Sequence, residues 1–414
     1  MNSNIAQTQL ESERESSIWK NKQFLFLWTG SSINSLTFHV FVLAIPIIIY
    51  ELTQSTLAMS AMRAIQFIPN VLLGIVIGVI VDRLNRKRLM LNALTTQIVI
   101  IASFVILLFS NSLQLWHLYL LGFVLYSSSY AFGNAYHTIL PLIMPKGQLT
   151  TANSALSFVS TLINLVGPAF AGFVLLYMSY TVGLTVTLAG MLVLLILTSF
   201  VQIPHQEKDT RKLDRQGIWL DIKEGWQQLV ATKELWIATL MVLVSNFASS
   251  LSGAVLIFYA LDSFKINSGE LGFIFSASAV GGFIAAFVAK KSREWASRGQ
   301  LFITAYYFAV AGQFILFLSM NWYWLAIGMF LLGIQVTFFN IHYLTLRQEA
   351  TPNHLLGRVA GTSSMIMKLA APFGYLVAGL LGEVIPVHYI FLGSTIIYLA
   401  VILVAIRTPL YKMK

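Results

Sequence analysis

The sequence predicts an all-α membrane protein with twelve transmembrane helices in two pseudo-symmetric six-helix bundles. Three observations support this prediction: 57% of the residues are hydrophobic and only 10% are charged, long apolar runs recur along the chain, and cations gather in short turns between those runs. A soluble domain carries about 25% charged residues, so lipid must replace water over most of this surface. Because unpaired backbone groups are costly in hydrocarbon, the apolar runs are expected to be helices.

Twelve apolar runs are each long enough to cross a bilayer, which takes about 20 helical residues. Six runs precede a polar stretch and six follow it. The runs are residues 24–50, 57–81, 89–110, 117–143, 152–178, 182–203, 235–261, 271–289, 301–320, 323–346, 359–381 and 388–406.

The two sets of six runs define the predicted organisation of the chain. Within the polar stretch, apolar residues at helical spacing from Ile218 to Leu229 predict a short helix at the membrane interface. The expected parts are a cytoplasmic tail (1–23), an N-terminal bundle (24–203), a cytoplasmic linker (204–234), a C-terminal bundle (235–406) and a cytoplasmic tail (407–414).

The Lys and Arg residues predict the orientation of these helices. With the N-terminus in the cytoplasm, 23 of the 26 cations fall in cytoplasmic segments, and the external loops hold Lys265 alone. Cytoplasmic loops carry an excess of cations, and one missed span would invert this split, so both termini are predicted to be cytoplasmic. The net charge of +10 then reflects topology and anionic lipid rather than nucleic acid. The first 22 residues lack the apolar segment of a cleavable signal peptide.

The two halves also resemble each other at an offset of 207 residues. Such matches favour parallel halves related by an axis along the membrane normal, with chance matching of small residues as the alternative. The matching pairs include Gly74 and Gly281, Arg83 and Lys290, Arg86 and Arg293, and Pro145 and Pro352.

The turn after the second run carries the most distinctive motif. Gly78, Asp82, Arg83, Arg86 and Lys87 form the pattern Gly-x-x-x-Asp-Arg-x-x-Arg-Lys between two apolar runs. The cations alone are explained by topology, because they resist translocation. The carboxylate adds nothing to orientation, which favours a gate that pairs with a neighbouring cation in one conformation only.

This turn resembles the signature loop of the major facilitator superfamily. The segments Phe26–Gly30, Tyr50–Ser55 and Leu356–Val359 are similar to the bacterial branch that contains macrolide-efflux proteins and the enterobactin exporter. The resemblance covers essentially the whole chain beyond Lys22. It implies secondary transport by alternating access, with the two bundles around a central cavity.

The fifth run contains a second pattern of that superfamily. Gly167, Pro168 and Gly172 resemble the Gly-Pro-x-x-Gly-Gly core of drug/proton antiporters, although Ala171 replaces one glycine and Ile163 occupies the place of another. Proline removes one helix hydrogen bond, and glycine allows close helix approach. The pattern therefore predicts a bend and a tight seam involved in gating, with a routine proline kink as the alternative.

Polar residues in runs 1, 4, 7 and 10 are candidates for the substrate cavity that the resemblance implies. Amphipathic walls suit a large, mostly apolar ligand, whereas interhelical hydrogen bonding is the alternative role for each residue. Lys368 in run 11 is costly inside a membrane unless it meets an anionic substrate group or a structural partner. The candidates are Ser35, His39, Tyr126, Tyr130, Asn134, Asn246, Gln335, Asn340 and Lys368.

No Asp or Glu lies deep in any predicted span. An embedded carboxylate is the usual proton carrier of transporters, so coupling must use other groups. His39 lies far from the ends of its run and titrates near neutral pH, and Glu51 ends the same helix. These two residues are the coupling candidates, and a neutral, hydrogen-bonded His39 is the alternative.

Together these features predict a secondary transporter of the bacterial plasma membrane. The favoured activity is proton-coupled efflux of an apolar or amphipathic small molecule; import or facilitated passage of a metabolite, and export of a siderophore or peptide, stay open. An enzyme is disfavoured: cysteine is absent, and no Walker, His-Glu-x-x-His or Gly-x-Ser-x-Gly motif occurs. We expect no cofactor and no metal. The expected partners are a small-molecule substrate, protons and the lipid bilayer, and no nucleic acid. The protein is expected to function as a monomer.

Overall fold

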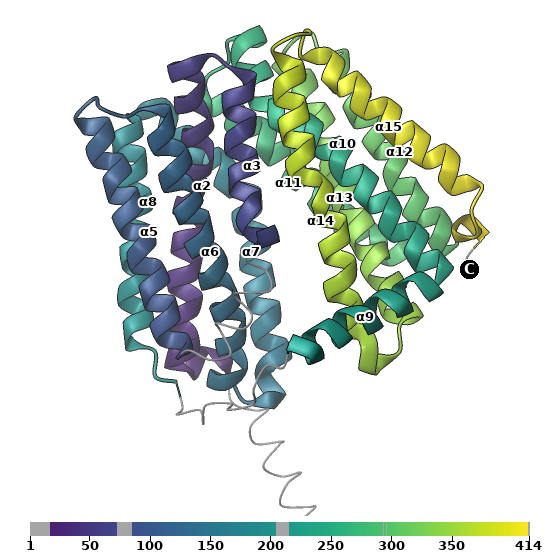
Figure 1. The fold of residues 1–414 in the computed structure, drawn as a ribbon. Coiled ribbons are helices and arrows are strands. Elements are labelled where there is room, and N and C mark those ends of the chain that lie inside the picture. Colours follow the sequence, from purple (N-terminus) through teal and green to yellow (C-terminus); the bar gives the residue numbers. More distant parts are fainter. Residues whose placement is uncertain (1–16, 73–84, 204–214, 293, 295, 413–414) are drawn as a thin grey trace, which may run out of the picture. The chain divides into compact units, whose positions relative to one another are not determined.

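The structure is a computed structural model that describes residues 17–72, 85–203, 215–292, 294 and 296–412. Within these residues the chain forms thirteen α-helices and four short 3-10 helices, without a β-strand (Figure 1). This confirms the predicted all-α class.

The helices follow the predicted runs closely. The first helices are α2 (Lys22–Thr53), α3 (Thr56–Leu72), α5 (Arg86–Phe109), α6 (Leu115–Ile143), α7 (Leu149–Tyr177) and α8 (Tyr180–Phe200). The later helices are α9 (Arg215–Ala231), α10 (Lys233–Phe264), α11 (Ser268–Ser292), α12 (Arg298–Phe317), α13 (Trp322–Ala350), α14 (Leu356–Gly382) and α15 (His388–Ile406). Short 3-10 helices cover Ile18–Lys20, Lys146–Gln148, Asn353–Leu355 and Pro409–Lys412.

Ten helices in the described part of the chain are long and apolar enough to cross a membrane. The two predicted spans outside this set are those of α3 and α6. α3 is described for 17 residues, and the rest of the expected run 57–81 lies outside the described residues. α6 has 29 residues and no charged side chain, and it contains several Ser, Tyr, Asn and His residues, which have low hydropathy. The count of twelve spans therefore stays a prediction.

Local sequence explains where several helices begin and end. The side chains of Asn85 and Ser179 accept backbone N–H groups of the first turns of α5 and α8. Such caps satisfy donors that a helix N-terminus leaves unpaired. Gln54, Asn111 and Lys265 have positive φ values and directly follow or nearly follow α2, α5 and α10, so they turn the chain sharply toward the next helix.

The chain divides into two compact units: residues 1–45 with 72–211, and residues 46–71 with 212–414. In the first unit α5 packs against α6 and α8; in the second, α10 packs against α14, and α12 against α13 and α15. The division predicted from the sequence, with bundles over 24–203 and 235–406, follows the order of the expected membrane spans and stays a prediction. Residues 46–71 group with the second unit because the end of α2 and the start of α3 bond to α10 and α14.

Each unit has its own buried core. The first includes Phe24 and Met90, which are 1% and 0% exposed. The second contains an aromatic cluster in which Tyr306 lies 5.6 Å from Phe302 and 6.2 Å from Tyr398, measured between ring centroids. Aromatic pairs in these arrangements add stability beyond the area that they bury.

A glycine seam joins α11 and α13 in the second unit. A Cβ atom at Gly281 would lie 2.0 Å from the Phe330 carbonyl oxygen, and one at Gly333 would lie 1.8 Å from the Ser278 carbonyl oxygen. Only glycine permits this backbone-to-backbone approach, which small residues commonly provide in membrane helices.

The helix predicted within the polar stretch is present as part of α9. It lies against α14: Glu224 forms an ion pair with Arg358, and Gly225 brings the two backbones together. A Cβ atom at Gly225 would lie 2.7 Å from the Arg358 carbonyl oxygen. The linker helix is therefore fixed to the start of α14 within the second unit.

Candidate substrate pockets and gating contacts

The structure describes only part of the signature turn. Gly78, Asp82 and Arg83 lie outside the described residues. Arg86 and Lys87 begin α5, where the Arg86 guanidinium donates to the Thr138 carbonyl at 3.2 Å and the Lys87 ammonium to the Ser199 carbonyl at 2.6 Å.

These two bonds join the start of α5 to the last turns of α6 and α8. The Ser199 carbonyl is among those that the C-terminus of α8 leaves unpaired, and cations interact favourably with such groups. Both bonds stabilise the first unit itself. Their predicted part in gating stays a prediction.

The glycine-proline pattern of α7 lies directly against the coupling candidate of α2. A Cβ atom at Gly167 would lie 2.3 Å from His39 Cδ2 and 2.7 Å from His39 Nε2, so only glycine admits the imidazole ring here. α7 continues through Pro168, and Gly172 is buried. The sequence patterns that predicted a seam and a proton carrier therefore meet at one contact.

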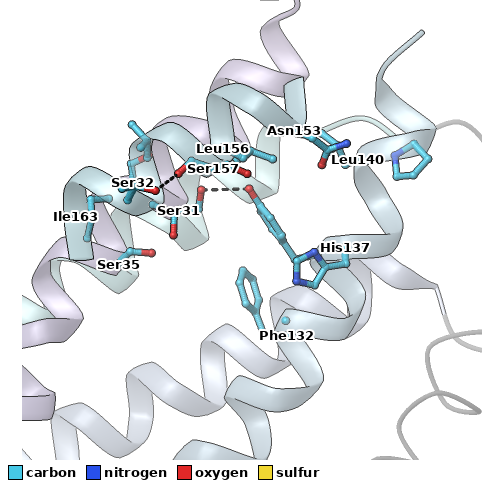
Figure 2. A pocket seen from close by; sticks show the side chains of 16 residues that line it. Ser31, Ser32, Ser35, Phe132, His137, Leu140, Asn153, Leu156, Ser157 and Ile163 are labelled. Atoms are coloured by element: carbon cyan, nitrogen blue, oxygen red, sulfur yellow. Dashed lines mark hydrogen bonds between the residues drawn. The ribbon is translucent and has the colours of Figure 1, made fainter. Parts of the chain in front are cut away.

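The first unit contains a pocket of about 700 Å³ between α2, α6 and α7 (Figure 2). Its wall is rich in hydroxyl groups and includes an aromatic and apolar part. The Tyr136 hydroxyl lies 3.3 Å from the Ser31 hydroxyl, which holds the ring across the pocket. The polar lining residues are Ser31, Ser32, Ser35, Tyr136, His137, Asn153, Ser157, Ser160 and Thr161.

Of the first unit's cavity candidates, only Ser35 lines this pocket. The Asn134 amide instead donates to the Tyr130 carbonyl within α6 at 2.8 Å, and Tyr126 packs near Phe41 with 6.3 Å between ring centroids. The pocket uses Phe132, Gly133, Tyr136 and His137, which occupy the adjoining face of the same helix.

The second unit contains a pocket of about 360 Å³ between α10, α13 and α14. All the second unit's cavity candidates line it, namely Asn246, Gln335, Asn340 and Lys368. The Asn246 amide donates to the Met367 carbonyl at 2.8 Å, which fixes one side of the pocket. Tyr343 and Arg347 complete the polar wall and were not predicted from the sequence.

The two pockets occupy equivalent places in the two halves of the chain. At the offset of 207 residues, Tyr136 corresponds to Tyr343 and Ser157 to Ser364, and each lines its own pocket. Each tyrosine also shares a hydrogen bond with a hydroxyl group of the first helix of its half; Tyr343 lies 3.1 Å from Thr239. The repeat is the sequence signal that identifies both tyrosines.

A carboxylate that the sequence analysis did not single out holds α14 to α3 within the second unit. Glu383, directly after α14, accepts from the Leu57 N–H at 3.0 Å, from the Ser55 hydroxyl at 2.7 Å and from the Thr56 hydroxyl at 3.1 Å. The Thr56 hydroxyl also lies 3.0 Å from the carbonyl oxygen of Gly379. The Leu57 N–H, and next the Ser55 hydroxyl, hold the pKa of the Glu383 carboxyl below its ordinary value.

A second polar contact of this kind joins α2 to α10. The Tyr50 hydroxyl donates to the Asp262 carboxylate at 3.2 Å, and Lys265 forms an ion pair with the same carboxylate at 3.3 Å. The neighbouring coupling candidate, Glu51, is exposed at the end of α2. These bonds and the Glu383 contact all join helix ends. In the predicted topology, those ends lie on the external side of the membrane.

Two pockets with polar walls, in a chain with ten described helices that are apolar enough to span a membrane, are typical of a membrane transport protein. The Major Facilitator Superfamily matches residues 27–375, and the chain belongs to that family. It is accordingly a multi-pass membrane protein and a transporter.

Curated relatives align with almost the whole chain. Macrolide efflux protein A of Streptococcus pyogenes is 25% identical over 400 residues, which are 93% of this chain and 95% of that protein. The multidrug efflux pump Tap of Mycolicibacterium fortuitum is 23% identical over 391 residues, which are 92% of this chain and 93% of that pump.

Solved structures share the fold. The nucleoside transporter NupG superimposes with a TM-score of 0.73 over 95% of this chain and 100% of that one, at 12% identity. A bacterial homologue of the iron transporter ferroportin in the inward-facing state gives a TM-score of 0.72 over 95% and 99%, at 17% identity.

Proposed function

We propose that this protein exports an apolar or amphipathic small molecule by alternating access, driven by proton entry. The observation that carries the proposal is the first unit's pocket, whose wall combines serine, tyrosine and histidine groups with apolar side chains. Such mixed walls suit ligands with a large apolar body and a few polar groups. The efflux relatives, which are named for macrolides or for several drugs, support export over import.

The Glu383 contact and the Tyr50 contact are the places where access of the substrate to the cavity is controlled. Glu383 and Tyr50 join helices through a few hydrogen bonds between exposed or half-buried groups. Exposed contacts of this kind are weak, about 1 kcal/mol each, and can open and close at modest cost. We place them at the external side, with both termini cytoplasmic.

We assign proton coupling to α2. His39 has no hydrogen bond to any described residue, lies in the middle of α2 and touches Gly167 of α7. A histidine changes charge near neutral pH, and a charge created here would disturb the tight seam between two helices. Glu51 at the end of the same helix is the second candidate.

Reconstituted liposomes test the proposal. The purified protein is expected to extrude the neutral amphiphile N-phenyl-1-naphthylamine when a proton gradient is imposed, and a macrolide is expected to compete. Protein-free liposomes are the blank. Extrusion should stop when a protonophore collapses the gradient.

The outcomes separate the alternatives. Extrusion that persists without a proton gradient, but requires sodium or a substrate on the opposite side, would replace the proton mechanism. Accumulation in the opposite direction under the same gradient would identify an importer. A macrolide that neither competes nor crosses the membrane would remove that class of substrate.

A further inference from the structure

The second unit's pocket holds two cations without an acidic partner. Lys368 and Arg347 both line it, and none of the described lining residues is Asp or Glu. Neither side chain forms an ion pair within the described part of the chain. The guanidinium carbon of Arg347 lies 5.9 Å from the centroid of the Tyr343 ring.

The position of Lys368 makes this unusual. It lies twelve residues after the first residue of α14, or about 18 Å along the helix axis, and about 21 Å before the last. This is too far from either end for the side chain to reach the membrane surface easily. An ionisable group at such a depth faces a cavity or a partner and commonly marks a ligand or ion pathway.

The repeat shows that the fold does not require either cation. The positions equivalent to Lys368 and Arg347 in the first half are Thr161 and Leu140, which line the first unit's pocket with neutral side chains. The two pockets are otherwise built alike, with paired tyrosines and serines. The cations are therefore a special feature of the second pocket, and a ligand accounts for them better than packing does.

We propose that the second unit's pocket binds the anionic group of an amphiphilic substrate, a carboxylate, sulfonate or phosphate. This inference rests on the proposed transport function and names the charge class of its substrate. Lys368 contacts the anionic group, and Asn246, Gln335 and Asn340 supply neutral hydrogen-bonding groups around it. Arg347 lies three residues before the end of α13 and adds a second positive charge to the pocket wall, which attracts the anion.

A matched pair of dyes tests the charge preference. 8-Anilinonaphthalene-1-sulfonate and N-phenyl-1-naphthylamine share one aromatic scaffold and differ in the sulfonate. Binding is measured with the full-length protein in nanodiscs of zwitterionic lipid, so that no headgroup supplies a net anion, and the signal of empty nanodiscs is subtracted. The protein is expected to bind the sulfonate more tightly than the neutral dye.

The variants use residues that the chain itself places at the equivalent positions. Lys368→Thr is expected to raise the Kd of the sulfonate about tenfold, as for loss of a hydrogen bond to a charged group, and to leave the neutral dye within about twofold. Lys368→Arg should retain sulfonate binding, and Arg347→Leu should weaken it less than Lys368→Thr does. Unchanged neutral binding shows that the variants are folded.

Equal effects on both dyes, or a protein that does not prefer the sulfonate, would overturn the anion site. The proposed transport is judged separately, by extrusion of the neutral dye from liposomes. Normal extrusion of the neutral dye by the unmodified protein, without a preference for the sulfonate in binding, sinks this inference alone. No extrusion by the unmodified protein sinks the transport proposal.

Discussion

The Glu383 carboxylate accepts the backbone N–H of Leu57 at 3.0 Å and so caps the first turn of α3 from a helix more than 300 residues away. A carboxylate at a helix N-terminus is favoured by the unpaired N–H groups and by the helix dipole. The contact therefore depends on the charge of one side chain. It is the natural point at which protonation would loosen α3 from α14.

We predict that Glu383→Gln weakens the contact between α3 and α14 by about 1 kcal/mol, because the carboxylate is exposed and its bonds are partly screened. The chain has no cysteine, so Leu57→Cys in α3 and Val384→Cys after α14 can carry spin labels cleanly. Both positions are exposed, at 36% and 82%. Glu383→Gln should add a longer component to the distance distribution between them.

The pH dependence of this contact has a fixed sign. The pKa of Glu383 is lowered in this conformation, so the contact is fully present above the ordinary pKa of the carboxyl and is lost as pH falls through the lowered pKa. Acidification of the parent protein should reproduce the longer component. Glu270→Gln is the matched control, because Glu270 caps its own helix through the Asn267 N–H. An equal response to Glu270→Gln would contradict a specific role for Glu383.

The close contact between α2 and α7 at Gly167 and His39 leads to a second prediction. Gly167→Ala should destabilise the protein by about 1–3 kcal/mol, because the new methyl group would overlap the His39 ring. Combining it with His39→Ala should recover most of that loss. The apparent melting temperature in detergent measures both effects.

Gly133→Ala is the control for this series, since a Cβ atom there meets nothing within 4 Å. Alanine favours a helix over glycine by about 1 kcal/mol, so this variant should be neutral or slightly more stable. The tight contact between Gly167 and His39 would be contradicted by a Gly167→Ala protein as stable as its parent. It would also be contradicted by a double variant no more stable than Gly167→Ala alone.

The topology gives a third prediction. Single cysteines in place of Lys22 and Arg407 should resist an impermeant thiol reagent in whole cells and react after the cells are opened. Val384→Cys should react in both cases, because the charge split places this exposed residue outside. Labelling of position 22 or 407 from outside would break the proposed orientation.

The sequence predicted the fold because hydropathy is a property of consecutive residues. Asn246, Gln335, Asn340 and Lys368, which the sequence proposed for a substrate cavity, all line the second unit's pocket, and their contact with a substrate stays a prediction. The repeat relates the helices that line the two pockets, because α10, α13 and α14 in the second half correspond to α2, α6 and α7 in the first.

Other parts of the site depend on contacts that sequence spacing cannot provide. Spacing shows that Tyr126, Tyr130 and Asn134 share a face of α6, but not which helix that face meets. The pocket instead lies on the face that carries Tyr136. Glu383 was missed because its role arises only when a loop residue meets a helix start far away in the chain.

The coupling prediction concerns His39 and Glu51. No described membrane span holds a carboxylate near its middle, so a proton must be carried by a histidine or by an acid at a helix end. His39→Ala should impair proton-driven extrusion and remove its pH dependence near neutral pH, where an imidazole changes charge. Glu51→Gln should have the same effect only if the carboxylate at the end of α2 also carries the proton.

Extrusion from liposomes at a series of pH values measures the effect of each variant. Glu270→Gln is the control, a neutralised acid that should have no effect. Normal proton-driven extrusion by both variants would show that neither residue carries the proton, and coupling would then have to use the Glu383 contact or a residue of the signature turn.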